Sequence, residues 1–323
     1  MRVIVYGAGA IGGVIGAQLF RQGHDVTFVA RGANYEALAR DGIRLETPAE
    51  TATFQVPVVD DPADLSFGPG DLVILAVKSH DTNDVLHRLV GVAPTSTAIV
   101  CAQNGVENER TALRNFPDVY GMCVMFPATH LAPGVVQASS SPVTGLLDVG
   151  RWPRGVDDRT RELATLLSAA SFDCVARDDI ARWKWGKLLM NLGNAVEALC
   201  GATASSWVLV QRAVQEGVEV LESAGIGYVE IDEDSLRRGQ LLTIGPIGGA
   251  LRGGGSSWQS LARSTGGIET DYLNGEIVLQ GRLFGVPTPV NELLCQLANQ
   301  TAIERRAPGT WSEQEVLALL DGR

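Results

Sequence analysis

Patterns typical of buried strands and of helices alternate along the first third of the chain. Short continuous apolar runs predict strands that are covered on both faces of a parallel sheet, and they occupy residues 2–6, 25–29, 71–77 and 97–101. Stretches with apolar residues at helical spacing separate them, at residues 11–22, 34–40 and 81–90. This alternation predicts a doubly wound α/β sheet, in which ligands bind beyond the carboxyl ends of the strands.

Further β-like pieces accompany these strands. Residues 42–46 and 53–58 alternate polar and apolar side chains, which is typical of strands with one solvated face. The later pieces are strands at 119–126, 134–138 and 143–149, a helix at 157–170 and a strand at 172–176. The first three of these are compatible with an antiparallel extension of the sheet.

The turn after the first predicted strand has the spacing G-x-G-x-x-G. Gly7 permits a tight turn, Gly9 lets the backbone approach a pyrophosphate, and Gly12 lets the next helix pack on the strand. The candidate cofactor-binding residues of this loop are Gly7, Ala8, Gly9, Ala10, Ile11 and Gly12. Glycines that serve only packing are the alternative. The order of strand, turn, amphipathic helix and second strand favours a dinucleotide-binding unit with phosphates at the helix N-terminus.

The residue after the second strand bears on the choice of cofactor. An acidic side chain there accepts the ribose hydroxyls of NAD, whereas an arginine pairs with the 2′-phosphate of NADP. The chain has Ala30-Arg31-Gly32 at this point. The missing carboxylate and Arg31 together predict NADP, although Arg31 is also compatible with an ordinary solvated strand end.

Two more polar residues follow predicted parallel strands. Lys78 comes directly after the run at 71–77, and Asn104 follows the run at 97–101. Both are therefore expected at the ligand-binding edge of the sheet. The alternatives are a surface cation at Lys78 and an ordinary Asn-Gly turn at Asn104.

No strand pattern is evident beyond Asp178. We therefore predict a Rossmann-like doubly wound domain at residues 1–177 and an all-helical domain at residues 178–323. A glycine-rich segment from Gly245 to Gly255 interrupts the second domain. It is either a plain loop or a lid that closes over an active site.

A polar stripe marks the otherwise apolar stretch at 178–199. Its members, at spacings of three, four and three, are Lys184, Lys187, Asn191 and Asn194. These spacings place them on one helix face. Because polar groups cannot remain dry and unpaired, the stripe must face water, another polar element or a ligand. Glu269, near the start of a later helix, is either a counter-charge or a solvated acid.

Composition excludes several classes of function. The 323 residues are 45% hydrophobic and can bury a sizeable core, and the net charge of −11 argues against nonspecific nucleic-acid binding. The five cysteines lack a C-x-x-C pair and are expected to be reduced, and neither they nor the four histidines have metal-ligand spacing. No run is long enough to span a bilayer. We expect a cytoplasmic protein without a metal.

Several motifs distributed over nearly the whole chain carry more information together than the glycine loop alone. Besides that loop they are Arg31, Ala76-Val77-Lys78, Gln103-Asn104-Gly105, Trp185-Gly186-Lys187-Leu188-Leu189-Met190-Asn191, Ser256-Ser257 and Ile268-Glu269-Thr270-Asp271-Tyr272-Leu273-Asn274-Gly275. With them the chain resembles the ketopantoate reductase (2-dehydropantoate 2-reductase) family.

The resemblance implies roles for individual residues. Lys187 would be the general acid, with Glu269 near it, and Asn191 and Ser257 would hold the substrate. The residues implied at the cofactor are Lys78, Glu269 and Asn104, the last beside both nicotinamide and substrate. Hydride addition to a ketone leaves an alkoxide, and a lysine ammonium both stabilises that charge and donates the proton. A nearby carboxylate favours the charged lysine.

The chain departs from the family around the substrate. Ala195-Val196 replaces an asparagine followed by proline, with Asn194 one place earlier, and we keep Asn194 as a substrate-binding candidate. Another family asparagine corresponds to a small residue near Ser205, and Trp258-Gln259-Ser260-Leu261 replaces the usual Met-Leu-Gln-Asp. A site built on hydrogen bonds rejects analogues that leave its polar groups unpaired, so these changes can alter specificity.

The resemblance, together with Arg31, implies NADPH-dependent reduction of the 2-oxo acid ketopantoate to pantoate, for pantothenate and coenzyme A synthesis. Residues 1–177 would bind NADP, and residues 178–323 would carry the substrate and catalytic groups. The alternatives are reduction of another branched 2-oxo acid and a noncatalytic NADP-binding sensor. Retention of both Lys187 and Glu269 speaks against the sensor. A homodimer is compatible with the sequence, which does not fix the oligomeric state.

Overall fold

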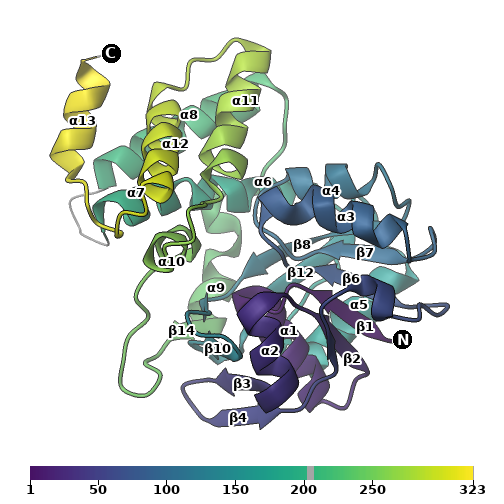
Figure 1. Cartoon of the computed structure of the whole chain (residues 1–323). Helices are drawn as coiled ribbons and strands as arrows, with labels where there is room; N and C mark the ends of the chain where they lie inside the picture. The colour runs from purple at the N-terminus through teal and green to yellow at the C-terminus, as the bar shows by residue number, and fades with distance from the viewer. Residues whose placement is uncertain (202–206, 323) are drawn as a thin grey trace. The chain divides into compact units, whose positions relative to one another are not determined.

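A computed structural model describes residues 1–201 and 207–322 and divides the chain into two compact units (Figure 1). Unit 1 comprises Met1–Lys184 and Asp232–Arg252, and unit 2 comprises Trp185–Ile231 and Gly253–Arg323. The predicted order, an α/β domain with a parallel sheet followed by a mostly helical region, is confirmed.

Within the described ranges, the main sheet of unit 1 has eight strands in the order β13-β12-β8-β7-β6-β1-β2-β5. They are β1 (Val3–Tyr6), β2 (Val26–Val29), β5 (Val58–Val59), β6 (Leu72–Leu75), β7 (Ala98–Cys101), β8 (Val119–Met125), β12 (Gly145–Arg151) and β13 (Phe172–Asp173). β12 runs antiparallel to β8, and the other neighbours are parallel. The predicted parallel strands and the antiparallel extension at 143–149 are therefore confirmed. The strand at 119–126 was also expected to extend the sheet antiparallel, but it runs parallel to its neighbour β7.

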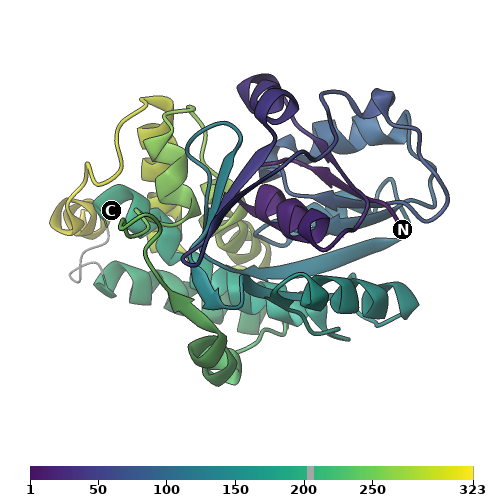
Figure 2. The same ribbon diagram turned by 90° about the horizontal axis from the view of Figure 1, so that it is seen from below.

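Helices cover both faces of this sheet. They are α1 (Ala10–Arg21), α2 (Gly32–Asp41), α3 (Thr82–Val90), α4 (Glu107–Ala112) and α5 (Asp158–Ala169), with short 3-10 turns η1 (Pro62–Asp64) and η2 (Ser79–Asp81). Because alternate strand residues point to opposite faces, Val3 and Val5 join the core under α1 and α5, whereas Ile4 and Tyr6 join the core under α3 and α4. Figure 2 shows α5 (teal) and α3 (blue) on opposite sides of the strands.

A smaller sheet lies in the same unit, in the order β4-β3-β10-β9. Its strands are β3 (Ile43–Glu46), β4 (Thr51–Phe54), β9 (Ala128–Thr129) and β10 (Val135–Ala138). Two predictions need correction here. The stretch 53–58 is not one strand, because β4 ends at Phe54 and the chain joins the main sheet only after Pro57, which cannot donate to a ladder. The piece at 134–138 pairs with β3 and β9 and does not extend the main sheet.

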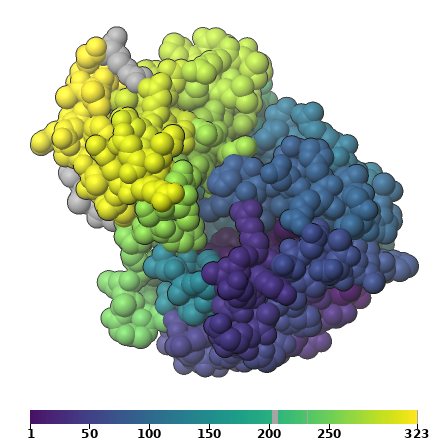
Figure 3. Space-filling model, in the orientation of Figure 1, coloured from purple at the N-terminus to yellow at the C-terminus, as the bar shows by residue number. Residues whose placement is uncertain are grey.

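Residues 232–252 belong to unit 1 although they follow a long helical stretch. They contain most of η4 (Ile231–Asp234), then α9 (Ser235–Leu241) and β14 (Leu242–Ile244). β14 pairs antiparallel with β11 (Ser140–Pro142), and Figure 3 shows the green segment adjoining the teal one. The prediction that no strand follows Asp178 is therefore wrong. A strand of three residues is too short to give a periodic signal.

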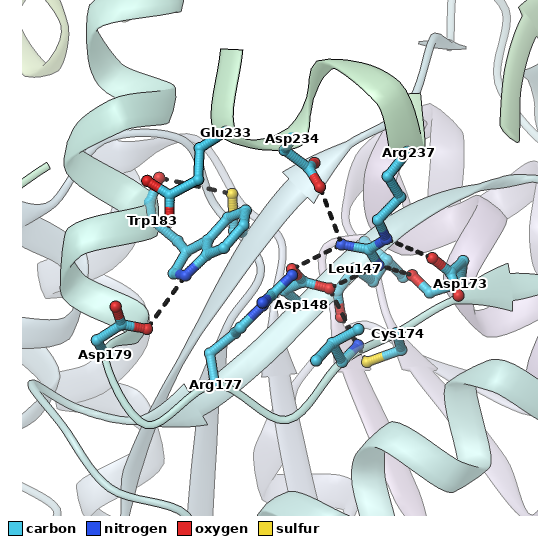
Figure 4. Close-up of polar contacts among 12 residues, drawn as sticks. Leu147, Asp148, Asp173, Cys174, Arg177, Asp179, Trp183, Glu233, Asp234 and Arg237 are labelled. Carbon is cyan, nitrogen blue, oxygen red and sulfur yellow. Dashed lines mark hydrogen bonds and ion pairs between the residues drawn. The ribbon is translucent and has the colours of Figure 1, made fainter. Parts of the chain in front are cut away.

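Arg237 attaches this returning segment to the main sheet (Figure 4). Its Nη1 and Nη2 each lie 2.9 Å from Asp148, a buried carboxylate on β12, and its Nε lies 2.6 Å from Asp173. Arg177 donates to the same Asp148 at 2.8 Å, and its guanidinium stacks 3.7 Å above the ring of Trp183. Two guanidinium groups thus compensate one buried carboxylate through charge-assisted hydrogen bonds.

The remaining described elements are helical. They are α6 (Ile180–Asn191), which begins in unit 1, and then α7 (Gly193–Cys200), α8 (Trp207–Ser223), α10 (Ser256–Ala262), η5 (Thr270–Tyr272), α11 (Asn274–Phe284), α12 (Pro289–Ile303) and α13 (Glu313–Asp321). Only Leu192 separates α6 from α7, and its φ of −61° and ψ of −29° stay helical, so the predicted helical stretch at 178–199 continues through it. In residues 1–201 and 207–322 no helix is long and apolar enough to cross a membrane. The five cysteines, all of which lie in the described residues, form no disulfide bonds.

Candidate functional site

The glycine loop connects β1 to α1 in unit 1. Gly7 has φ +104°, which side chains rarely adopt, and a Cβ there would lie 2.9 Å from the Ala76 carbonyl. A Cβ on Gly12 would collide with the Gly7 carbonyl oxygen, so α1 can approach the strand only with glycine at this position. At Gly9 no described atom lies within 4 Å of such a Cβ. The loop therefore combines a tight turn and close packing with one open side.

Asn34, which was not among the residues predicted from the sequence, holds this loop in place through two hydrogen bonds. Its Nδ2 donates to the Ala8 carbonyl at 2.9 Å, and its Oδ1 accepts from the Gly134 N–H at 2.8 Å. Ala8 is buried, whereas Ala10 and Ile11 are partly exposed. An asparagine in the first turn of a predicted helix carries no sign that it bonds a distant loop, so only the structure identifies it.

Arg31 and Lys78 lie at the carboxyl ends of strands on either side of β1. Arg31 follows β2 with its side chain 81% exposed, and its Nη2 is 2.6 Å from an oxygen of Asp81. Lys78 follows β6 at the start of η2 and is partly buried. Since β1 lies between β2 and β6 in the sheet, the glycine loop and both cations are at the same sheet edge.

Buried hydrogen bonds join the loops that carry Lys78 and Asn104. Gln103 Nε2 donates to the Val77 carbonyl at 3.0 Å and to Thr82 Oγ1 at 2.7 Å. Thr82 Oγ1 in turn donates to Asn108 Oδ1 at 2.7 Å, and Asn108 Nδ2 donates to the Asn104 carbonyl at 3.1 Å. The loops after β6 and β7 are therefore held as one polar structure.

Lys184 extends this structure to helix α6. Its ammonium forms an ion pair with Glu109 and donates to the Gln103 carbonyl at 3.0 Å. The side chains of Lys184 and Glu109 are 3% and 0% exposed. Burial raises the pKa of the Glu109 carboxyl, and the nearby charge of Lys184 opposes that rise. The first member of the predicted polar stripe thus faces another polar element. Glu109 could not be identified from its surroundings in the sequence, because the segment from Glu107 to Arg110 has the composition of a solvated helix face.

The other members of the stripe belong to unit 2. Lys187 is partly buried on α6, and Asn191 is buried one turn later on the same helix. Within the part of the chain that the structure describes, Asn191 Nδ2 is buried without a hydrogen-bond partner. An unpaired buried donor is costly, so a group that accepts from it would be bound favourably.

Asn274 links the segment that follows Glu269 to the end of α6. Its Nδ2 donates to the Leu192 carbonyl at 3.1 Å and to Asn291 Oδ1 at 3.0 Å. Asn274 is fully buried, and Glu269, which precedes η5, is 7% exposed. This contact fixes the backbone beside Asn191 and the short turn after Glu269 relative to each other. Asn274 belongs to the sequence motif at residues 268–275, but the motif alone did not indicate what Asn274 contacts.

Ser257 is buried in the first turn of α10, which packs on α7. The Gly255 N–H at the start of α10 donates to Glu197 Oε2 at 2.9 Å, and Asn194 lies beside the same glycine. Glu197 thereby fixes the helix end that carries Ser257. Trp258 packs against Gly253 and Gly254, where larger residues would collide with its ring.

The predicted site residues fall into two sets by unit. Unit 1 holds the glycine loop, Arg31, Lys78 and Asn104. Unit 2 holds Lys187, Asn191, Asn194, Ser257 and Glu269. The substituted family position near Ser205 lies outside the described residues.

Comparison with protein families matches both halves of the chain. Residues 3–153 match the family described as "Ketopantoate reductase PanE/ApbA", and residues 179–302 match "Ketopantoate reductase PanE/ApbA C terminal". The 2-dehydropantoate 2-reductase of Archaeoglobus fulgidus is 30% identical over 305 residues, covering 92% of this chain and 96% of that protein. The corresponding enzyme of Pyrococcus horikoshii is 27% identical over 310 residues, with the same coverage.

Solved structures have the same fold. A PanE/ApbA family ketopantoate reductase from Ralstonia eutropha JMP134 superimposes with a TM-score of 0.78 at 27% identity, covering 94% of this chain and 99% of that one. D-mandelate dehydrogenase in complex with NADH and anilino(oxo)acetate superimposes with a TM-score of 0.80 at 21% identity and the same coverage. The second likeness concerns the fold alone.

Proposed function

Because the chain belongs to the ketopantoate reductase family and is a 2-dehydropantoate 2-reductase-like oxidoreductase, we propose that it reduces ketopantoate to pantoate with NADPH. The observation that supports this most directly is the unpartnered amide of Asn191, one turn after Lys187 on α6. A carbonyl or carboxylate oxygen of a 2-oxo acid is an acceptor of the kind that this donor lacks.

The proposed cofactor residues fit a phosphorylated dinucleotide. The backbone around Gly9 is open where a pyrophosphate would approach, while Gly7 and Gly12 have no room for a side chain. Arg31 is exposed at the strand end and suits a 2′-phosphate, and Lys78 and Asn104 are the other residues of unit 1 that we assign to the cofactor. NADPH supplies the hydride when bound.

The acid of the proposed reaction is Lys187. Its ammonium would stabilise the negative charge that develops on the ketone oxygen and then transfer a proton to it. Asn191, Asn194 and Ser257 would orient the substrate, and Glu269, nearly buried, would keep Lys187 charged and oriented. Glu269 also contributes to cofactor binding in this proposal, and Asn104 to substrate binding.

The chain differs from the family around the proposed substrate-binding residues. Ala195 and Val196 are buried on α7, where the family carries asparagine and proline, and Trp258 covers the glycines before Ser257. These differences favour, as a second candidate, another branched 2-oxo acid with the same hydride chemistry. A noncatalytic NADP sensor would have no need of both Lys187 and Glu269.

We further propose a homodimer in the cytoplasm. A ketopantoate reductase from Staphylococcus aureus with this fold is described as dimeric, which supports the oligomeric state by analogy. Sedimentation velocity of the purified protein tests it directly, and a single species of monomer mass at micromolar concentration would reject it.

A substrate panel tests the proposed function. NADPH oxidation is followed by absorbance with ketopantoate and with other branched and aromatic 2-oxo acids. Turnover with ketopantoate at the highest kcat/KM supports the leading assignment, and turnover only with another acid supports the second candidate. No turnover with any acid, despite measurable NADPH binding, favours the sensor.

A further inference from the structure

The backbone on both sides of Asn104 is held by side chains. Lys184 Nζ donates to the Gln103 carbonyl at 3.0 Å, and Asn108 Nδ2 donates to the Asn104 carbonyl at 3.1 Å. Gly105 then turns the chain with φ +81°. The two peptide groups that flank the Asn104 Cα are therefore fixed, which restricts the directions that its side-chain amide can take.

The donor to the Gln103 carbonyl is the charged side chain of Lys184. Lys184 is almost completely buried, and its charge is compensated by the fully buried Glu109 on α4. Replacing a buried ion pair by apolar residues of similar volume is often neutral or even stabilising, because both charges lose their hydration. Stabilisation of the fold is thus a weak explanation for the pair. The pair is better explained by the hydrogen bond to the Gln103 carbonyl, because Glu109 keeps the Lys184 ammonium in one place as the donor.

We propose that Lys184 is a positioning residue which, held by Glu109, fixes the Gln103–Asn104 peptide and so orients Asn104 for the reaction. This inference rests on the proposed function, because only there does Asn104 contact nicotinamide and substrate. Lys184 itself touches neither ligand in this proposal. It acts one residue away, through the backbone.

The competing explanation is that the pair merely stabilises unit 1. A double variant, Lys184→Met with Glu109→Leu, separates the two. It removes the donor to the Gln103 carbonyl without leaving an unpaired charge in the core, and both replacements are close in volume to the originals. The single Lys184→Met variant leaves Glu109 unpaired, so the double variant is the informative one.

We expect the double variant to fold and to melt near the temperature of the parent protein. Its kcat should fall roughly ten- to a hundredfold, because small misplacements of a group at the reacting centre have effects of this size. The Kd for NADPH, measured by fluorescence, should change less than about twofold, since the glycine loop and Arg31 hold most of the cofactor. Hydrogen exchange of residues 103–105 should become faster.

Arg182→Met is the matched control. Arg182 lies on the same helix half a turn earlier, and its ion pair with Glu233 is exposed. Removing this pair should leave kcat, NADPH affinity and exchange at 103–105 unchanged. A double variant with parental kcat and parental exchange would overturn the positioning role. If the parent protein itself turns over no 2-oxo acid, the proposed function fails, and the exchange at 103–105 alone decides whether Lys184 fixes the loop.

Discussion

Arg31 pairs with Asp81 across neighbouring loops of the sheet edge, with Nη2 and Oδ2 2.6 Å apart. The arginine is 81% exposed and the aspartate 21%, so the carboxylate is the better fixed of the two. A 2′-phosphate would have to compete with this carboxylate for the guanidinium. Arg31, which we propose binds the 2′-phosphate of NADP, is thus already part of an ion pair in the described structure.

Replacing Arg31 tests the choice of cofactor. Arg31→Gln should weaken NADPH binding by about 1.5–3 kcal/mol, the usual cost of a lost charge-assisted hydrogen bond. NADH lacks the 2′-phosphate, so its Kd should change far less. Fluorescence titration with both cofactors measures this, and equal losses for the two would reject the assignment of Arg31.

Replacing Asp81 should have the opposite effect. Asp81→Asn frees Arg31, and an ion pair with one exposed partner contributes at most about 1 kcal/mol, so NADPH should bind up to about fivefold tighter. The gain in affinity should shrink as ionic strength rises.

Asp81 makes no side-chain capping bond to α3 in the described structure, so the variant leaves that helix end intact. Asp84→Asn, an exposed acid of the same helix, is the control. Unchanged or weaker NADPH binding in Asp81→Asn would contradict the competition.

Local rules were sufficient for the parts of the fold that depend on nearby residues. The sequences of β1, β6 and β7 are wholly apolar because both faces are covered, and Gly7 and Gly12 have the spatial reasons expected from their spacing. The capping box at Asp157 also follows from a local pattern. These elements were predictable without knowledge of distant partners.

The missed features depend on residues far apart in sequence. β14 exists because Leu242–Ile244 pairs with Ser140–Pro142, and Glu109 is buried because Lys184 lies opposite it. Neither partner alters the hydrophobic pattern around the other. The polar stripe was expected to face water, another polar element or a ligand, and its first member, Lys184, faces another polar element. No local signal could identify Glu109 as the partner of Lys184, or Asn274 as the donor to the Leu192 carbonyl.

Asp157 caps helix α5 and carries a pH-dependent share of stability. Burial raises its pKa, but hydrogen bonds from Thr160, Tyr120 and Arg151 outweigh this and lower the pKa to about 2. Because the folded pKa lies below the unfolded value of about 3.9, its stabilisation is present above that value and is lost as pH falls toward 2. Asp157→Ala should cost about 1–2 kcal/mol at neutral pH, chiefly the cap, and less near pH 2.

Denaturant unfolding at pH 7 and at low pH measures this difference. Asp158→Ala is the control, since that neighbouring carboxylate is fully exposed and pairs with Arg161 one turn later. A loss for Asp157→Ala that is equal at both pH values would show that its charge contributes nothing.

The segment from Gly245 to Gly255 was predicted to be either a loop or a lid. About half of its residues are exposed, Gly254 is buried and Arg252 is partly buried, and a bridge joins Ile247 and Ala250. If it closes over ligands, trypsin cleavage after Arg252 should slow when NADP and substrate are present together, and less with either alone. Arg252→Gln identifies the fragment. Cleavage that is unaffected by both ligands together would leave the plain loop.

Lys187 carries the proposed chemistry, and its replacement is the decisive test. Lys187→Ala should leave the fold and the NADPH affinity nearly intact, because the glycine loop and Arg31 belong to the other unit. It should lower kcat by a factor on the order of 10² to 10⁴, the usual contribution of a positioned general acid. Asn191→Ala, one turn later, should instead raise KM at least as much as it lowers kcat, since it removes a donor to the bound acid. Steady-state kinetics of both variants on the best substrate of the panel separate these roles. A Lys187→Ala enzyme with near-parental kcat would exclude Lys187 as the acid, whatever the substrate proves to be.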